Sequence, residues 1–223
     1  MDRFRVVTGV AAPFGEADID TDIIFPARFL LIMEKAGLGK HLFHERRYNR
    51  SNGQSAFILN TPPFDTAGIL VAGRNFGTGS SREHAVWALL DFGIRCVIAP
   101  SFGEIFQTNS FKNGLLCIAQ PEATNARILA AAATGQPMTV DLEEQTIRLP
   151  NAETIGFAVD AHSRRALLLG LDEIDLIMAD DGADIARFEA EQRRRAPWLY
   201  LGRDQLAYFD DIRKGEPDEG NVP

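Results

Sequence analysis

Residues 69–85 read ILVAGRNFGTGSSREHA, and this stretch decides the fold class because it passes from a buried strand through a glycine turn into a helix. Residues 69–72 form a short continuous apolar run, which is typical of a strand buried on both faces. From residue 80 on, apolar side chains recur at helical spacing, which predicts a helix over residues 80–92. Gly77 and Gly79 let the backbone turn sharply between the two elements. The stretch therefore predicts a strand–turn–helix unit of an α/β protein.

The same alternation of strands and helices continues on both sides of this stretch. Further strands are expected at residues 4–7, 56–59, 96–99 and 115–119, and helices at residues 103–112 and 123–134. This order predicts parallel strands joined by right-handed crossovers. Beyond residue 134, three short strands with turn-sized gaps are expected at residues 138–142, 146–149 and 155–159, followed by helices at residues 161–169 and 185–196. We expect a mostly parallel sheet flanked by helices, with a small β extension.

The predicted domain organisation is simple. Residues 1–180 are expected to form one domain, because neither repeats nor a clear linker interrupt them. Residues 181–223 are expected to form a C-terminal helical extension, of which the polar, Pro- and Gly-containing residues 214–223 form a disordered tail.

Composition and charge exclude several classes of protein. Of 223 residues, 45% are hydrophobic and 24% are charged, which is typical of a soluble globular protein. The net charge of −8 opposes binding to phosphate backbones, so no nucleic-acid partner is expected. No apolar run is long enough to span a bilayer, and residues 1–4 do not open a signal peptide. Cys96 and Cys117 suffice neither for a disulfide framework nor for an iron–sulfur cluster. We expect a reduced cytoplasmic protein without a metal of its own.

The turn at residues 73–83 has the features of an anion site. Ser80 with Glu83 three residues later is a capping-box pattern, and a helix N-terminus there would present free N–H groups. Arg74 and Arg82 add cations, while Glu83 is the only acid over residues 68–90. Arg82 stands where a dinucleotide fingerprint needs its third glycine, and a P-loop lysine is absent. Because arginine suits planar carboxylates, a small polycarboxylate fits best, although a simple helix cap and turn would also explain these residues.

Three weaker patterns were weighed for metal binding or hydrolysis. Asp18, Asp20 and Asp22 have the spacing of a calcium loop, but residues 23 and 29 are Ile and Phe where Gly and Glu are required, so these carboxylates are expected to cap and tie a loop. His41 and His44 lack a third ligand at a defined spacing, and a surface helix is the expected explanation. A serine hydrolase pairing Ser80 with His84 would still lack the nucleophile-elbow motif.

Residues 75–85, NFGTGSSREHA, closely resemble the signature of the swivelling domain of the aconitase superfamily. Residues 20–26, residues 97–102 with Phe106 and residues 109–111, and residues 170–174 are similar to the corresponding stretches of the small subunits of bacterial 3-isopropylmalate dehydratases. The resemblance implies a swivelling β/β/α domain. It also implies a large-subunit partner, in a heterodimer or heterotetramer, that carries a [4Fe–4S] cluster with one open iron site. In that family 2-isopropylmalate becomes 3-isopropylmalate in leucine biosynthesis, by dehydration and rehydration through an unsaturated intermediate.

The resemblance also implies roles for individual residues. Ser80 would be the base that removes and returns the carbon-bound proton, stabilised by the helix N-terminus and nearby N–H groups. Ser81 would hold a substrate carboxylate through its backbone N–H, and Arg82 would clamp it. The remaining residues expected at the substrate site are Asn75, Gly77, Gly79, Thr21 and Lys35.

The choice of substrate is left open by the segment after Pro26. Many bacterial relatives have Arg-Thr-Gly where this chain has Lys35-Ala36-Gly37, and lysine does not reproduce the planar grip of arginine. Related hydro-lyases act on 2-methylmalate or citraconate, on dimethylmalate, or on homoaconitate. A stand-alone polycarboxylate-binding protein is an alternative of a different class. Dependence on a partner subunit for turnover separates it from the enzyme.

Overall fold

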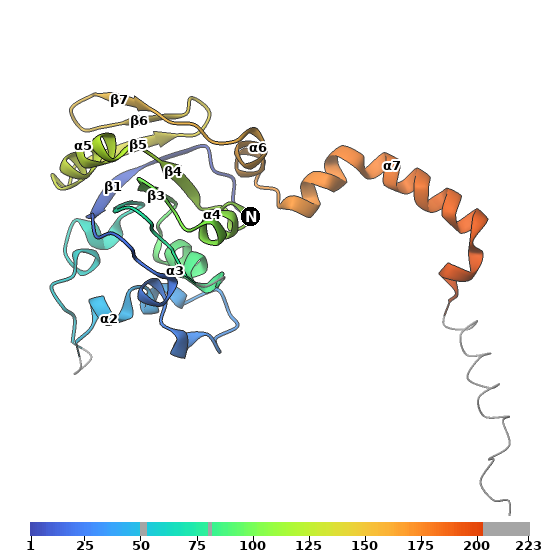
Figure 1. Cartoon of the computed structure of the whole chain (residues 1–223), viewed down its shortest axis with the longest axis horizontal. Coiled ribbons are helices and arrows are strands. Elements are labelled where there is room, and N and C mark those ends of the chain that lie inside the picture. The colour runs from blue at the N-terminus through green and yellow to red at the C-terminus, as the bar shows by residue number, and fades with distance from the viewer. Residues whose placement is uncertain (50–52, 80–81, 203–223) are drawn as a thin grey trace, which may run out of the picture. The chain divides into compact units, whose positions relative to one another are not determined.

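The computed structural model describes residues 1–49, 53–79 and 82–202, and it divides into two compact units, residues 1–174 and residues from 175 onward. The first unit is built on a single sheet with helices on both faces (Figure 1). The strands are β1 Val6–Phe14, β2 Ile69–Ala72, β3 Cys96–Ala99, β4 Leu116–Ala119, β5 Pro137–Asp141, β6 Thr146–Arg148 and β7 Thr154–Gly156. Their order across the sheet is β4-β3-β2-β1-β5-β6-β7.

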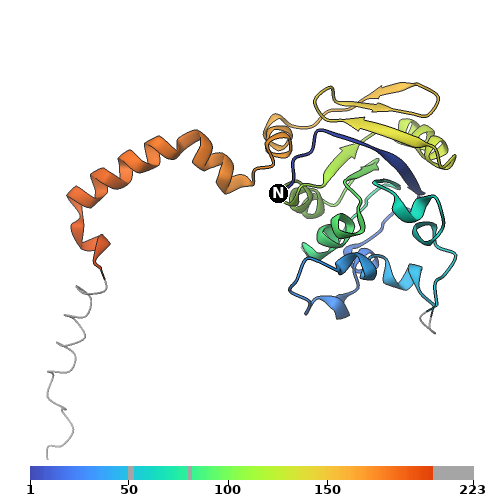
Figure 2. The same ribbon diagram turned by 180° about the vertical axis from the view of Figure 1, so that it is seen from behind.

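Strand β1 joins two halves of the sheet that run differently. Its second part, Ala11–Phe14, pairs in parallel with β2, and β3 and β4 continue this parallel half. Its first part, Val6–Val10, pairs antiparallel with β5, and β6 and β7 extend that half as a meander (Figure 2). The predicted parallel strands and β extension are both confirmed. The extension continues the same sheet.

The residues of β2 show how the two faces of the sheet are covered. Side chains alternate along a strand, so Leu70 and Ala72 belong to one buried cluster and Ile69 and Val71 to the other. The first cluster includes residues of α3 (His84–Phe92) and of the segment between β1 and β2, which contains α1 (Thr21–Ile24) and α2 (His44–Arg47). The second includes residues of α5 (Glu122–Ala132) and α6 (Ala161–Leu169). Helix α4 (Glu104–Asn113) contributes Phe106 to the first cluster.

The strand expected at residues 56–59 is wrong. Ile58–Asn60 forms a 3₁₀ turn instead, with local hydrogen bonds from Asn60 N to Phe57 O and from Thr61 N to Ile58 O. Both edges of β1 are already taken by β2 and β5, so the sheet offers this segment no place beside its neighbour in the chain. In this turn, Leu59 is buried in the first cluster, which also contains residues of α3.

The second unit contains most of helix α7, which runs from Glu173 to Arg195, and a 3₁₀ turn at Pro197–Tyr200. The helix begins twelve residues before the predicted start at Ile185. Tyr200 Oη donates to Gln192 Oε1 at 2.7 Å, so the turn folds back on the end of α7. The tail expected at residues 214–223 lies outside the described residues. Within residues 1–49, 53–79 and 82–202, none of the helices has both the length and the apolar character needed to cross a membrane.

Candidate functional site

The glycine turn, residues Gly73–Gly79, directly follows β2 and lies between two other loops. On one side it approaches the segment after β1: a Cβ on Gly73 would lie 2.3 Å from Glu16 O, and Gly77 N donates to Ile19 O at 2.7 Å. On the other side it meets the loop after β3, where Phe76 N donates to Ser101 O at 3.0 Å. The carboxyl ends of neighbouring parallel strands meet at one edge of a sheet, which is the usual ligand position in open α/β sheets.

Asn75 fastens the turn to both neighbouring loops. It has a positive φ of 56°, which few residues other than glycine and asparagine adopt easily. Its backbone N–H donates to Ser101 Oγ at 2.9 Å, and its side-chain Nδ2 donates to Asp18 Oδ1 at 2.9 Å. Ser101 was not anticipated as part of the site, although its position directly after β3 is the signal that could have found it.

Thr21 brings a buried hydroxyl to the turn. Its backbone N–H donates to Thr78 O at 3.0 Å, and its side chain is only 1% exposed. Within the part of the chain that the structure describes, Thr21 Oγ1 has no hydrogen-bond partner. It lies 3.9 Å from the position of a Cβ on Gly79, so the hydroxyl faces the glycine turn. Since a buried hydroxyl without a partner is unfavourable, this group is suited to receive a ligand.

The two cations predicted at the turn are paired with acids from another loop. Arg82 forms an ion pair with Asp22, and Arg74 Nη2 lies 3.8 Å from Asp18 Oδ2. Both acids come from the loop before β2, more than fifty residues earlier in the chain, so they did not enter the local charge count. Arg82 presents five N–H donors, and a single carboxylate oxygen does not occupy them all. It therefore keeps the capacity to bind a second carboxylate.

Asp20 completes the role predicted for the three acids of this loop. Its Oδ1 accepts from Ile23 N at 2.7 Å and caps α1. With Asp18 on Asn75 and Asp22 on Arg82, the expectation that these carboxylates cap and tie a loop is confirmed.

The helix after the turn starts later than predicted. Ser80 and Ser81 lie outside the described residues, and α3 begins at His84, with Glu83 as its N-cap residue. The capping-box assignment of a helix start at Ser80 is therefore wrong. Within the described residues, the side chain of Glu83 makes no capping hydrogen bond to this helix end.

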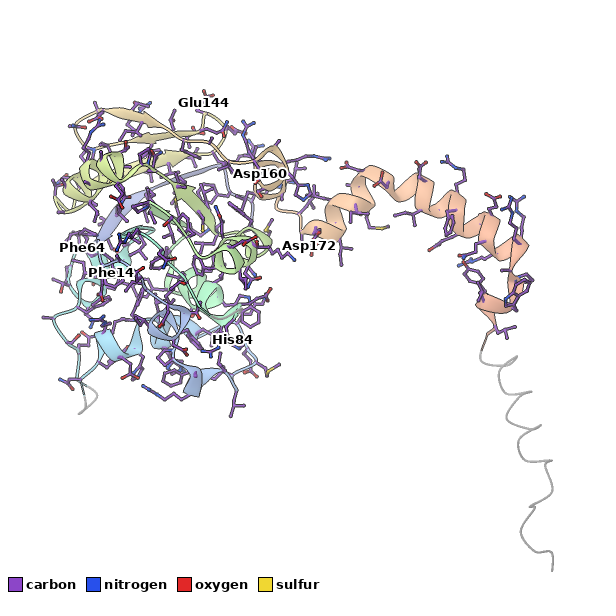
Figure 3. All side chains as sticks on the ribbon, in the orientation of Figure 1. Phe14, Phe64, His84, Glu144, Asp160 and Asp172 are labelled. Atoms are coloured by element: carbon purple, nitrogen blue, oxygen red, sulfur yellow. The ribbon has the colours of Figure 1, made fainter. Side chains whose placement is uncertain are left out.

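His84 (labelled in Figure 3) lies among aromatic rings at the start of α3. Its ring is 5.8 Å from that of Phe25, in a stacked arrangement, and 4.7 Å from that of Trp87. Its Nε2 is buried and lacks a hydrogen-bond partner among the residues that the structure describes. These contacts make His84 part of the packing that supports the turn.

Lys35 contacts Trp87, one helical turn after His84 in α3, and Asn113 at the end of α4. Its Nζ lies 4.6 Å from the centroid of the Trp87 ring and donates to Asn113 Oδ1 at 3.3 Å. These two contacts of Lys35 are with Trp87 and Asn113, and Trp87 lies beside His84 at the start of α3.

The histidines and cysteines show no arrangement that would hold a metal. His41 stacks on Phe29 at 4.0 Å, and His44 Nδ1 lies 2.9 Å from Arg28 Nη2. Cys96 and Cys117 are both buried, and burial raises the pKa of their thiols. No group of three or more potential ligands from His, Cys, Asp and Glu occurs among the described residues.

Comparisons with known proteins show which class of protein this chain belongs to. The family model described as the aconitase C-terminal domain matches residues 1–123, and the model LeuD_N matches residues 126–161. A glycine turn at the carboxyl end of a parallel strand, within such a match, defines this chain as an aconitase-type domain.

The relatives narrow the class to one family. The 3-isopropylmalate dehydratase small subunit of Dinoroseobacter shibae is 50% identical over 89% of this chain and 100% of that protein. The small subunit of Rhodospirillum rubrum is 48% identical over 91% and 99%. The crystal structure of 3-isopropylmalate dehydratase (leuD) from Methanocaldococcus jannaschii matches with a TM-score of 0.60 and 28% identity, over 82% of this chain and 99% of that one. This chain belongs to the 3-isopropylmalate dehydratase small-subunit family.

Proposed function

We propose that this chain is the small subunit of a 3-isopropylmalate dehydratase, a hydro-lyase that acts only together with a large subunit. The observation that carries the proposal is an identity of about 50% that extends over the whole length of curated small subunits. The reaction removes a carbon-bound proton and the hydroxyl of the adjacent carbon, which gives an unsaturated diacid. Returning both groups with their positions exchanged converts 2-isopropylmalate to 3-isopropylmalate in leucine biosynthesis.

Ser80 is the proposed base for this proton transfer. A serine hydroxyl is a weak base unless its alkoxide is stabilised, and N–H groups and a cation near the glycine turn are suitable stabilisers. Arg82 is the nearest such cation in the chain, and its pairing with Asp22 fixes its position. The hydroxyl of Thr21, which lacks a partner among the described residues, is proposed as a further polar contact for the substrate at this turn.

Binding of the substrate is assigned to the same turn. Arg82 is proposed to clamp one carboxylate, with the backbone N–H of Ser81 beside it. Asn75, Gly77 and Gly79 shape the turn, and their positive φ angles direct its N–H groups. The proposed substrate carries two carboxylates. A guanidinium is suited to bind one of them, because it pairs with carboxylates in a planar geometry.

The residues of this chain do not fit a cluster of their own. A [4Fe–4S] cluster needs thiolates, whereas the thiols here are buried and have raised pKa values, about 12 for Cys117. We therefore assign the cluster to the large subunit, in a heterodimer or heterotetramer, where it would supply a Lewis acid for the departure of the hydroxyl. Two unpaired cysteines also agree with a reducing cytoplasmic location.

The decisive experiment is anaerobic co-purification with a cluster-bearing large subunit from the same genome. We expect turnover of isopropylmalate by the pair and none by either subunit alone. Preference for methylmalate or citraconate, dimethylmalate, or homoaconitate would leave the proposed mechanism unchanged and would assign the enzyme a different substrate. Tight dicarboxylate binding by the lone chain, with no activity in any pairing, would instead support a stand-alone binding protein.

The role of Ser80 is tested in the same assembled enzyme. Ser80→Ala is expected to lower kcat by several orders of magnitude, because the proton then has no acceptor, while substrate binding changes little. Ser55→Ala, which removes a hydroxyl that donates only to Arg46 O, is the matched control. Unchanged kcat in Ser80→Ala would remove Ser80 from the mechanism.

A further inference from the structure

Residues 26–37 form a loop that leaves α1 and returns to the side of α3. In its middle, Leu30 and Ile32 pack, partly buried, against the first cluster, whereas Leu31 is 92% exposed and Met33 is 79% exposed. Its first part is held by Arg28, which pairs with Glu45, and by Phe29, which stacks on His41. Residues 33–36 are all exposed, so the position of this last part depends on what holds the other end of the loop.

Lys35 holds that other end through two contacts. Its ammonium lies 4.6 Å from the Trp87 ring centroid, within the range of a cation–π interaction. The same ammonium donates to Asn113 Oδ1 at 3.3 Å, and Trp87 Nε1 donates to that oxygen at 2.8 Å. Asn113 Nδ2 donates to Asn109 O at 2.9 Å, which orients the amide with its oxygen toward Lys35 and Trp87.

The chain immediately after Lys35 is fixed by a carboxylate of α3. Asp91 accepts from Gly37 N at 3.0 Å with Oδ1 and from Gly39 N at 2.7 Å with Oδ2. Gly37 has a φ of 84°, which lets the backbone turn its N–H toward this acceptor. The loop therefore ends on α3 at two adjacent points, Lys35 on Trp87 and Gly37 on Asp91.

Trp87 connects this end of the loop to the glycine turn. Its ring lies 4.7 Å from that of His84, which in turn lies 5.8 Å from Phe25. Phe25 N donates to Thr21 O at 2.9 Å, and Thr21 N donates to Thr78 O in the turn. A continuous series of packed rings and backbone bonds thus runs from Lys35 to the proposed substrate site.

We propose that Lys35 is a positioning residue, which holds the 26–37 loop on Trp87 and Asn113 and acts on the substrate site through α3 without touching the substrate. Lys35 is exposed, and it lines a hollow of about 490 Å³ together with Trp87 and Asn113, which its ammonium contacts. The proposal rests on the proposed function for its effect on catalysis, but the contact itself can be tested on the chain alone.

The contact is tested by the fluorescence of Trp87. The chain has two tryptophans, so Trp198→Phe leaves Trp87 as the single reporter. In that background Lys35→Ala is expected to increase the acrylamide quenching constant and shift the emission, since the ring loses its cover. Lys35→Arg should retain the parent behaviour, and Lys40→Ala, at an exposed lysine five residues later, should leave it unchanged. Identical quenching in the parent and Lys35→Ala would overturn the proposal.

The effect on the reaction is tested in the assembled enzyme with a double-mutant cycle. We expect Lys35→Ala and Asn113→Ala each to raise KM about two- to fivefold, the size expected for an exposed cation–π contact, with kcat nearly unchanged. The effect of the double variant should be smaller than the sum of the two single effects, because both single changes remove the Lys35–Asn113 hydrogen bond. A KM increase of roughly 100-fold in Lys35→Ala alone, as for a lost charged hydrogen bond, would make Lys35 a substrate ligand and overturn the proposal.

The two proposals fail in different ways. An assembled parent enzyme without turnover of isopropylmalate or its analogues would refute the proposed function. The quenching measurement on the chain alone would still decide whether Lys35 holds the loop.

Discussion

Gly77 and Gly79 both have positive φ angles, 75° and 94°, but the molecule needs glycine at the two positions for different reasons. A Cβ on Gly77 would lie 2.2 Å from Cγ of the buried Phe106 ring, whereas among the described residues the nearest atom to a Cβ on Gly79 is Asp20 Cβ at 3.6 Å. At position 77 glycine is thus required by both the backbone conformation and the packing, and at position 79 by the backbone conformation alone.

We expect Gly77→Ala to lower the free energy of unfolding by about 3 kcal/mol, through overpacking added to the left-handed strain. Gly79→Ala should lower it by only about 1 kcal/mol, through the strain alone. Urea denaturation of the isolated chain measures both, and equal losses would contradict the distinction.

The buried thiols give a second prediction at the residue scale. Burial raises the pKa of the Cys117 thiol to about 12 and that of Cys96 well above its ordinary value. Since only the thiolate reacts, neither cysteine should react with a disulfide reagent at pH 8 in the folded chain. Both should react after unfolding in urea, which serves as the control. Rapid labelling of one thiol in the native protein would show that its strand opens readily.

The site residues show how far sequence reasoning reaches at this scale. The glycines and the ties made by Asp18 and Asp20 could be predicted, because local spacing and turn chemistry carry that information. The pairing of Arg82 with Asp22 was missed, because it joins residues sixty positions apart and depends on how β1 and β2 pair. Residue type predicts what a side chain can do, and the topology of the sheet decides which partner it meets.

At the scale of elements, the segment Leu38–Arg47 carries two histidines that titrate abnormally. Burial lowers the pKa of His41 and of His44 below the ordinary value of 6.5, and the neighbouring cations Lys40 and Arg28 lower it further. The unfolded chain therefore binds protons at these sites at a higher pH than the folded chain. Their contribution to stability is complete above pH 6.5 and is lost as the pH falls below it.

We expect the urea concentration at the unfolding midpoint of the isolated chain to decrease as the pH is lowered from 7.5 to 5.5. In the double variant His41→Gln/His44→Gln the decline over this range should be smaller, since the remaining decline comes from other groups. Parallel denaturation curves at pH 7.5, 6.5 and 5.5 measure the difference. An equal decline in parent and variant would show that these histidines do not contribute.

The elements themselves were predictable where periodicity was strong. Residues 69–72, 96–99 and 161–169 form the predicted strands and helix, because buried apolar runs and an amphipathic repeat specify them locally. Residues 56–59 failed because a short apolar run packs equally well as a turn, and only the occupied edges of β1 exclude a strand. The start of α7 was missed because residues 173–184 are rich in acids and give little apolar periodicity.

At the scale of the whole molecule, we propose that residues 1–180 form the domain that folds and residues 181–223 an extension. A chain ending at residue 180 should then retain the unfolding midpoint of the full chain to within about 0.5 kcal/mol, the size of a surface change. A chain ending at residue 160, which lacks the buried Leu167 of α6, is the destabilised control. A large loss in the 1–180 chain would place part of the extension in the folded core.

Strand β1 has a consequence for how the chain acquires its fold during synthesis. Its partners follow it at a long distance in the chain, since β2 begins at residue 69 and β5 at residue 137, so both emerge long after it. Until then β1 presents unpaired backbone groups, which are a template for pairing with other nascent chains. Contacts between such distant segments also slow folding, because long loops must close first. The glycine turn packs on Glu16, just beyond β1, so a ribosome must add well over a hundred residues after β1 before the sheet beneath the glycine turn is complete.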